Sequence, residues 1–374
     1  MQKMKPEKIK PIYLYQYDSE TSTCNKGYNL IESKNMDDSI REYTLTYDSP
    51  YSTGVKINDR VHAQLFLNKN MTWSNVGNLD NGNNDCNNNY NDDSFDNKSK
   101  SNDILILIHG FLTNEIKLKR YYSFIKKINS NNISGAFLNL PFHLNRTPAG
   151  EKSGRRLINF DDLDILLFFH QSVVDIKKLI DILKQNWNFN NIYICGISLG
   201  CMISVIAMAN DNRINKGIFL IGGGNWEEVH WKGISRLTLK GNCIYKDKKY
   251  KNKTRRQACR EIYACFPEFL KKFKETKYKK IKIDSEGLSD SDLKEVTARM
   301  CFLCDPLTFA NKINPQNVLM INAKYDFFFN KKSVNHLWEE LGRPEIYWLN
   351  NFHTTNILAD KKVLSKINDF LSES

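Results

Sequence analysis

The sequence predicts an α/β protein built on a doubly wound, mostly parallel sheet with an inserted helical cap. Three observations support this prediction. Apolar strand-like segments alternate with helix-like segments from residue 104 onward, which is typical of right-handed βαβ units in a parallel sheet. A strand, a sharp turn and a helix are expected to meet at residues 196–200. The alternation stops between residues 225 and 312, which we expect to form the cap.

The first 103 residues divide into two parts. Residues 1–73 are expected to supply N-terminal strands of the sheet, because they contain three short segments rich in β-branched and aromatic residues. These segments are Ile12–Tyr17, Tyr43–Tyr47 and Val61–Leu67. Residues 74–103 contain eleven Asn and six Asp with almost no apolar side chains. We expect a low-complexity insertion that forms a disordered surface loop.

Residues 104–224 are expected to form the first part of the core. The segment Ile104–Ile108 is continuously apolar, as expected for a strand buried on both faces of a parallel sheet. The same alternation continues through three strands and three helices. The strands are Ile133–Leu140, Ile192–Gly196 and Ile214–Ile221, and the helices are Glu115–Ile128, Asn159–Trp187 and Leu199–Ala209.

The cap and the second part of the core complete the chain. Residues 225–312 contain two stretches of helical composition, Arg255–Phe273 and Ser289–Phe302. Residues 313–374 then resume the alternation. The expected elements are a strand at Val318–Ala323, a helix at Lys332–Leu341, a strand at Glu345–Leu349 and a last helix from about Thr355.

Composition and cysteine usage narrow the class of protein. The chain has 374 residues, of which 41% are hydrophobic and 26% charged, as in a soluble globular protein. No apolar run reaches the ~18–20 residues of a membrane span, and Met1–Lys10 lacks the apolar stretch of a secretory signal. The nine cysteines are scattered, so we expect a cytoplasmic protein. Cys301 and Cys304 form a lone CxxC pair without a second pair at zinc spacing; no metal site and no cofactor is predicted.

The positive charge is concentrated in one block. Residues 240–282 contain 16 Lys or Arg against four acids, an excess equal to the net charge of +12 for the whole chain. A solvated, lysine-rich surface is the expected explanation. Nucleic acid is not expected as a partner. Peripheral contact with a membrane or another anionic surface through this block is kept as a less favoured alternative.

The motif Gly196-Ile197-Ser198-Leu199-Gly200 predicts a catalytic nucleophile. It matches GxSxG and lies directly between an apolar strand and an apolar helix. That arrangement holds the serine at a strained turn with its hydroxyl exposed, and the two glycines leave room for the turn. Ser198 is therefore the candidate nucleophile.

A serine hydroxyl needs a base, and the base needs a carboxylate. His353 follows the final strand, at the edge of the sheet where sites form. Asp326 follows the strand before it, which gives the chain order Ser198, Asp326, His353. Glu227 and Glu228 are the fallback acids. His170 and His336 fall in predicted helices and are expected to be structural.

Two backbone amides are expected to stabilise the oxyanion. One is the N–H of Leu199, the residue after the nucleophile. The other is the N–H of Phe111, with Leu112 as the alternative, in the loop that begins His109-Gly110. His109 is expected to support this loop. His143, a loop residue at the same edge, is expected to line the substrate site.

These motifs resemble the α/β-hydrolase superfamily. The matching segments are ILIHGF (106–111), GISLG (196–200), KYD (324–326) and FH (352–353). LPFHLNRTPAG (140–150) and DPLTFA (305–310) look like segments of uncharacterised bacterial members. The resemblance implies an eight-stranded sheet with a variable cap after the sixth strand. Phe111 directly after His109-Gly110 departs from the HGGG-type esterases.

The function that these residues favour is hydrolysis of a carboxylic ester or thioester of a small acyl substrate through an acyl-enzyme on Ser198. An acyltransferase or an amidase or peptidase would use the same three residues. A non-catalytic ligand-binding protein with this fold is a further alternative, although such proteins often lose one of the three. The sequence leaves the acyl group, the role of the cap and the oligomeric state open.

Overall fold

The structure is a computed structural model that describes residues 12–17, 27–33, 40–69, 102–129, 131–187, 189–233, 252–275, 281–284, 287–288 and 299–373. Most of the asparagine-rich insertion at 74–103, the terminus Met1–Lys10 and much of the basic block at 240–282 lie outside the described residues. No helix among the described residues is long and apolar enough to cross a membrane.

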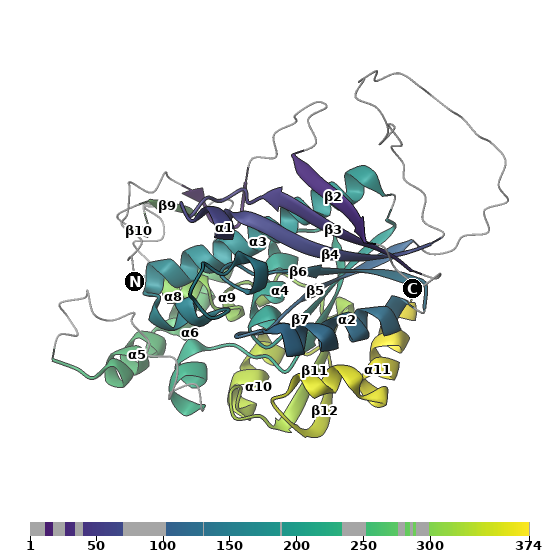
Figure 1. Cartoon of the computed structure of the whole chain (residues 1–374). Coiled ribbons are helices and arrows are strands. Elements are labelled where there is room, and N and C mark those ends of the chain that lie inside the picture. The colour runs from purple at the N-terminus through teal and green to yellow at the C-terminus, as the bar shows by residue number, and fades with distance from the viewer. Residues whose placement is uncertain are drawn as a thin grey trace.

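A large twisted sheet forms the centre of the molecule (Figure 1). Within the described residues it has nine strands in the order β12-β11-β8-β7-β5-β6-β4-β3-β2. The six strands from β12 to β6 are parallel, and β4, β3 and β2 continue the sheet antiparallel. The strands span Tyr28–Ser33 (β2), Ile40–Asp48 (β3), Arg60–Asn68 (β4), Asp103–Ile108 (β5), Ile133–Leu138 (β6), Asn191–Ile197 (β7), Ile214–Leu220 (β8), Val318–Tyr325 (β11) and Glu345–Phe352 (β12).

The doubly wound, mostly parallel sheet is confirmed, but its N-terminal edge differs from the expectation. The sheet has nine strands in the described residues instead of the implied eight, because β2 adds an edge strand that the sequence did not reveal. The segment expected as a strand at Ile12–Tyr17 supplies only β1 (Ile12–Tyr13). This strand pairs with β9 (Lys282–Asp284), which also pairs with β10 (Gly287–Leu288), outside the main sheet.

Helices cover both faces of the sheet, and alternation along each strand decides which side chains meet them. In β5, Ile104, Ile106 and Ile108 pack in one core cluster and Leu105 and Leu107 in the other. The first cluster includes the buried faces of α3, α4 and α10, and the second those of α2 and α11. These helices span Glu115–Asn129 (α2), Asp162–Asn186 (α3), Leu199–Asn210 (α4), Lys331–Glu340 (α10) and Lys361–Ser372 (α11).

The start of α3 is fixed by its cap residues. Asp161 accepts a hydrogen bond from the amide of Asp164, whose own side chain accepts from the amide of Asp161. This capping box fixes the start of α3, because it satisfies amides that have no partner within the helix. Shorter helices are α1 (Lys56–Asp59), η1 (Leu144–Arg146), η2 (Arg155–Asn159), η6 (Pro315–Asn317) and η7 (Thr355–Ala359).

The segment between β8 and β11 carries helices that pack beside α3 and α4 (Figure 1). Its described helices are η3 (Glu228–Lys232), α5 (Arg255–Ala264), α6 (Phe266–Glu275), α8 (Met300–Leu303) and α9 (Leu307–Ala310). Aromatic rings hold them together: the Phe266 and Phe302 ring centroids lie 4.7 Å apart, and those of Phe269 and Phe302 5.0 Å apart. The stretch of helical composition at Arg255–Phe273 forms two helices, α5 and α6.

Candidate active site

Ser198 lies at the turn between β7 and α4. Its backbone has φ 58° and ψ −117°, a conformation that L-residues rarely adopt and that is often held at functional sites. The two flanking glycines make the turn feasible. A Cβ at Gly200 would overlap the carbonyl oxygen of Ile108 at the end of β5, and a Cβ at Gly196 would overlap the carbonyl of Gly200. The sequence folds into this strained turn because those positions carry no side chain.

A hydrogen-bonded chain connects Ser198, His353 and Asp326. The Nε2 atom of His353 lies 2.9 Å from Oγ of Ser198, and Nδ1 lies 2.7 Å from Oδ2 of Asp326. Because a carboxylate only accepts, Nδ1 carries the proton and Nε2 accepts from the serine hydroxyl. The sequence places Asp326 directly after β11 and His353 directly after β12, which are parallel neighbours, so both side chains emerge at one edge of the sheet.

The carboxylate of Asp326 is fixed by its own loop. Its Oδ1 atom accepts from the backbone amides of Phe328 at 2.7 Å and Phe329 at 2.9 Å, which leaves Oδ2 for His353. The rings of Phe328 and Phe329 lie 4.7 and 5.8 Å from the His353 ring. The fallback acids lie elsewhere: Glu228 pairs with Lys332 at 2.9 Å.

The loop after β5 lies against Ser198. A Cβ at Gly110 would be 3.3 Å from Cβ of Ser198, so only glycine allows this approach without displacement. Phe111, Leu112 and Leu199 line the same pocket as Ser198. Leu199 is the first residue of α4, where a helix has no carbonyl to accept the N–H. The two amides expected to hold an oxyanion therefore belong to segments that meet at the serine.

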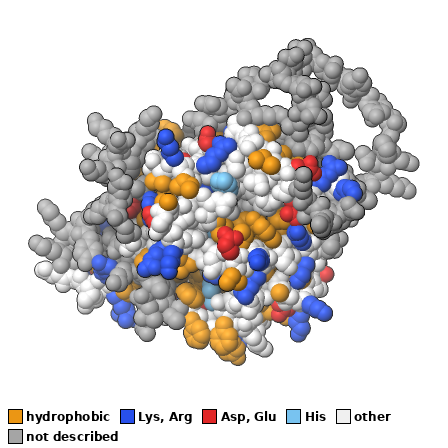
Figure 2. Space-filling view, in the orientation of Figure 1, with side chains coloured by type: hydrophobic (Ala, Val, Ile, Leu, Met, Phe, Trp, Pro, Cys, Tyr) orange, Lys and Arg blue, Asp and Glu red, His pale blue; other side chains and the backbone are white. Residues whose placement is uncertain are grey.

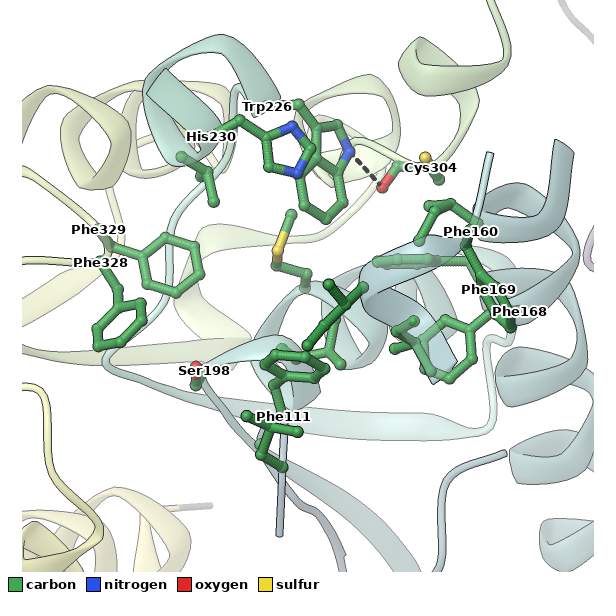
Figure 3. Close-up of a pocket in the computed structure, with 18 of the residues that line it drawn as sticks. Phe111, Phe160, Phe168, Phe169, Ser198, Trp226, His230, Cys304, Phe328 and Phe329 are labelled. Atoms are coloured by element: carbon green, nitrogen blue, oxygen red, sulfur yellow. Dashed lines mark hydrogen bonds between the residues drawn. The ribbon is translucent and has the colours of Figure 1, made fainter. Parts of the chain in front are cut away.

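Ser198 opens onto an apolar pocket of about 400 Å³. Aromatic side chains form much of its wall, among them Phe160, Phe168, Phe169 and Trp226. Figure 3 shows Ser198 on one side of the cavity and Cys304 on the other. Three side chains of α5 also line it: Cys259, Ile262 and Tyr263. The wall therefore combines the sheet-and-helix core with helices from the segment between β8 and β11.

Trp226 and His230 line the pocket but were not identified from the sequence. Their rings stack with centroids 4.9 Å apart, and Figure 3 shows both at the pocket. Burial lowers the pKa of His230 to about 4, so the ring is neutral near pH 7. The available signal was their position just after Gly222–Gly224, at the carboxyl end of β8.

His143 does not line the pocket as expected. It is buried, and its Nδ1 donates to the carbonyl of Pro141 at 2.8 Å. Its ring lies behind the pocket wall, with its centroid 5.0 Å from that of His109 and 6.3 Å from that of Phe111. The His143 ring is kept out of the pocket because the backbone at Gly154 packs directly against the ring and covers it.

Asp305 attaches the segment after β8 to the pocket wall. Its carboxylate accepts from the amides of Asn225, Trp226 and Leu307 at 3.0–3.1 Å and from the Tyr263 hydroxyl at 3.0 Å. Burial raises the pKa of Asp305 to about 6, although these hydrogen bonds act in the opposite direction. The carboxylate of Asp305 thus links the segment directly after β8 to α5 and α9.

Comparison with known proteins identifies the family. Residues 95–372 match the family described as Alpha/beta hydrolase domain containing 18. The chain belongs to this family. The hydrolase also resembles the Uncharacterized protein YdjC of Bacillus subtilis (strain 168), with 31% identity over 97 residues that cover 26% of this chain and 80% of that protein.

A solved structure agrees with the fold of this hydrolase. The acetyl xylan esterase from Paenibacillus sp. R4 superposes with a TM-score of 0.53, covering 91% of this chain and 88% of that one at 12% sequence identity. At this identity the likeness establishes the fold alone. The expected membership of the α/β-hydrolase superfamily is confirmed.

Proposed function

We propose that this α/β hydrolase is a serine esterase that cleaves carboxylic esters or thioesters with an apolar acyl group. The observation that carries the proposal is the hydrogen-bonded chain from Ser198 through His353 to Asp326 at the wall of an apolar pocket. The distances match those of an activated serine nucleophile, in which a base oriented by a third group accepts the hydroxyl proton.

The reaction follows from these contacts. Ser198 Oγ attacks the acyl carbon while His353 Nε2 takes the hydroxyl proton, and Asp326 stabilises the resulting imidazolium. The amides of Phe111 and Leu199 hold the oxyanion of the tetrahedral intermediate. His353 then gives the proton to the departing alcohol or thiol, leaving the acyl group on Ser198. Water activated by the same imidazole breaks this acyl-enzyme and restores the serine.

The pocket supports a substrate with an acyl group longer than acetyl. Its volume of about 400 Å³ is within the ~300–1,000 Å³ range of small-molecule sites, and aromatic side chains line it away from Ser198. Each methylene buried there would favour the bound transition state by about 0.8 kcal/mol, or about fourfold in kcat/KM. We expect kcat/KM for p-nitrophenyl esters to rise with acyl length until the chain fills the pocket.

Labelling with a fluorophosphonate probe tests the nucleophile. Wild type should be labelled, and Ser198→Ala should lose both labelling and ester hydrolysis. Ser204→Ala is the matched control. Ser204 is a buried serine of α4, the helix that follows Ser198, and its hydroxyl has no hydrogen-bond partner among the described residues. Equal labelling of wild type and Ser198→Ala would refute the proposal. Labelling without ester hydrolysis, with acyl transfer to an added alcohol or amine, would favour the acyltransferase alternative.

A further inference from the structure

Exposed hydrophobic residues gather at the mouth of the pocket. Nine large hydrophobic residues are exposed in the described part of the chain, and six of them form this group, which we call the rim patch. It consists of Leu112, Ile116, Tyr325, Phe327, Phe328 and Phe352, with exposed fractions from 37% to 67%. A concentration of this kind marks an interaction surface, whereas single exposed apolar residues do not.

Ring contacts and one hydrogen bond connect the rim patch to the active site. Phe327 stacks on Phe352 with centroids 5.8 Å apart, and Tyr325 lies 5.8 Å from Phe352. Phe328 and Leu112 line the pocket itself. From the α2 side, Arg120 donates to the Thr355 hydroxyl at 3.0 Å, which joins α2 to the segment after β12. The patch is therefore continuous with the pocket of Ser198 through Leu112 and Phe328.

The segments that carry the rim patch hold more basic than acidic residues, although Lys332 is paired with Glu228 and Asp161 and Asp162 line the pocket itself. These three segments, residues 111–120, 324–332 and 351–356, contain six Lys or Arg. Their acids are only Glu115 and the buried Asp326. Figure 2 shows hydrophobic side chains at the lower edge of the molecule and Lys and Arg side chains elsewhere on the same face. Aromatic rings framed by cations are typical of surfaces that bind the headgroup region of anionic membranes.

We propose that the rim patch docks this protein on the surface of an anionic phospholipid membrane, with the pocket mouth facing the lipid. None of the six residues of the rim patch belongs to the basic block at 240–282. A second copy of the chain fits the patch less well. A symmetric contact would bring identical cations together, and each copy would close the other's pocket. A lipid surface neutralises the cations and leaves the pocket open to molecules dissolved in the membrane.

Flotation with phospholipid vesicles tests the proposal in the Ser198→Ala background, which leaves the lipid chemically unchanged. Vesicles of phosphatidylcholine with phosphatidylglycerol should bind the protein, and pure phosphatidylcholine should bind it more weakly. The double substitution Phe327→Ser with Phe352→Ser should reduce binding at least about tenfold, because it removes the rings that enter the interface. Both side chains are exposed, so the thermal midpoint should change little.

The control is Ile31→Ser, an exposed hydrophobic residue of β2 at the opposite edge of the sheet; it should bind vesicles like the parent. Three results would overturn the proposal. One is vesicle binding that the double substitution leaves intact. Another is binding that disappears only when Lys271, Lys272 and Lys274 of α6 are replaced by Gln. The last is that the protein binds no vesicles and instead forms a concentration-dependent dimer, which the double substitution abolishes. Binding is read without turnover, so the result is independent of the proposed esterase activity.

Discussion

The imidazole of His109 donates from Nδ1 to the carbonyl oxygen of Gly110, 2.8 Å away. Its Nε2 accepts from the amide of Leu140 at 3.1 Å, and burial holds the pKa of His109 well below its usual range. The Thr113 hydroxyl donates to the same Gly110 carbonyl at 2.8 Å. Because a trans peptide directs its C=O and N–H in opposite directions, these two donors fix the direction of the Phe111 amide.

Replacing His109 with Gln should lower kcat with little change in KM. The Phe111 N–H would lose its fixed direction, and its proposed contact with the oxyanion exists only in the transition state. Loss of a whole oxyanion donor lowers kcat by about 10²–10³-fold, so partial misdirection should lower it by about ten- to a hundredfold. Steady-state kinetics on a soluble ester measures both constants.

The control for this substitution is His170→Gln. His170 is also buried, but it accepts from the amide of Tyr15 and does not line the pocket. The His170→Gln substitution should lower stability without a selective loss of kcat. Equal kinetic effects of the two substitutions would contradict a positioning role for His109.

Replacing Asp326 with Asn should lower kcat by about 10⁴-fold, since an amide no longer selects the His353 tautomer that accepts from Ser198. Glu228→Gln, at the fallback acid, should leave kcat unchanged because Glu228 contacts Lys332 and Asn330 instead of His353. The two variants are compared by kcat on one ester. A large loss in Glu228→Gln with retained activity in Asp326→Asn would reverse the assignment.

The parts of the fold that could be predicted are those that a short stretch of sequence identifies by itself, through an apolar run or a motif. The strands β5, β7 and β8 each contain a run of apolar residues, at 104–108, 192–197 and 217–220. Ser198, Asp326 and His353 follow from a motif and from chain order. The edge strand β2 could not be found, because Tyr28–Ser33 includes Asn, Glu and Ser and has no fully buried residue. A two-residue strand such as β1 is formed only by pairing with β9, far along the chain.

The pocket wall was less predictable than the nucleophile, because side-chain direction depends on long-range packing. His143 was placed at the correct edge of the sheet, yet the chain at Gly154 covers its ring. Trp226 and His230 enter the pocket because Asp305 holds the β8 exit against α5. The division between α5 and α6 had a local signal in Pro267, which lies in the first turn of α6, a position that proline favours.

Asp305 should make stability depend on pH. Its folded pKa of about 6 lies above the ordinary value of 3.8, so the folded state binds the proton more tightly than the unfolded chain does. Its contribution to the free energy of unfolding is therefore greatest below about pH 4 and falls, by about 3 kcal/mol in total, as the pH rises from about 4 to about 6.

Thermal unfolding of wild type and Asp305→Asn from about pH 4 to about pH 7.5 checks this. The variant should be less stable throughout, since an amide group cannot accept from all four donors of Asp305. Its deficit relative to wild type should shrink as the pH rises, because only wild type loses this contribution. A deficit that grows with pH would mean that Asp305 has a lowered pKa.

Filling the α5 side of the pocket should change acyl-chain selectivity. Cys259 is a buried residue of α5 that lines the pocket, so Cys259→Phe would occupy space meant for the end of a long chain. We expect kcat/KM for long p-nitrophenyl esters to fall more than about tenfold, with the acetyl ester little changed, because a pocket discriminates by the methylenes it admits. Cys259→Ala should move the optimum toward longer chains.

The matched control is Cys265→Phe, at the exposed C-terminal cap of the same helix. It adds the same ring outside the pocket and should leave the chain-length profile unchanged. If Cys259→Phe lowered the rates of short and long esters equally, the acyl chain would not extend toward α5. The opposite shifts expected for Phe and Ala at position 259 separate a change in pocket length from general damage to the fold, since damage would lower all rates in both variants.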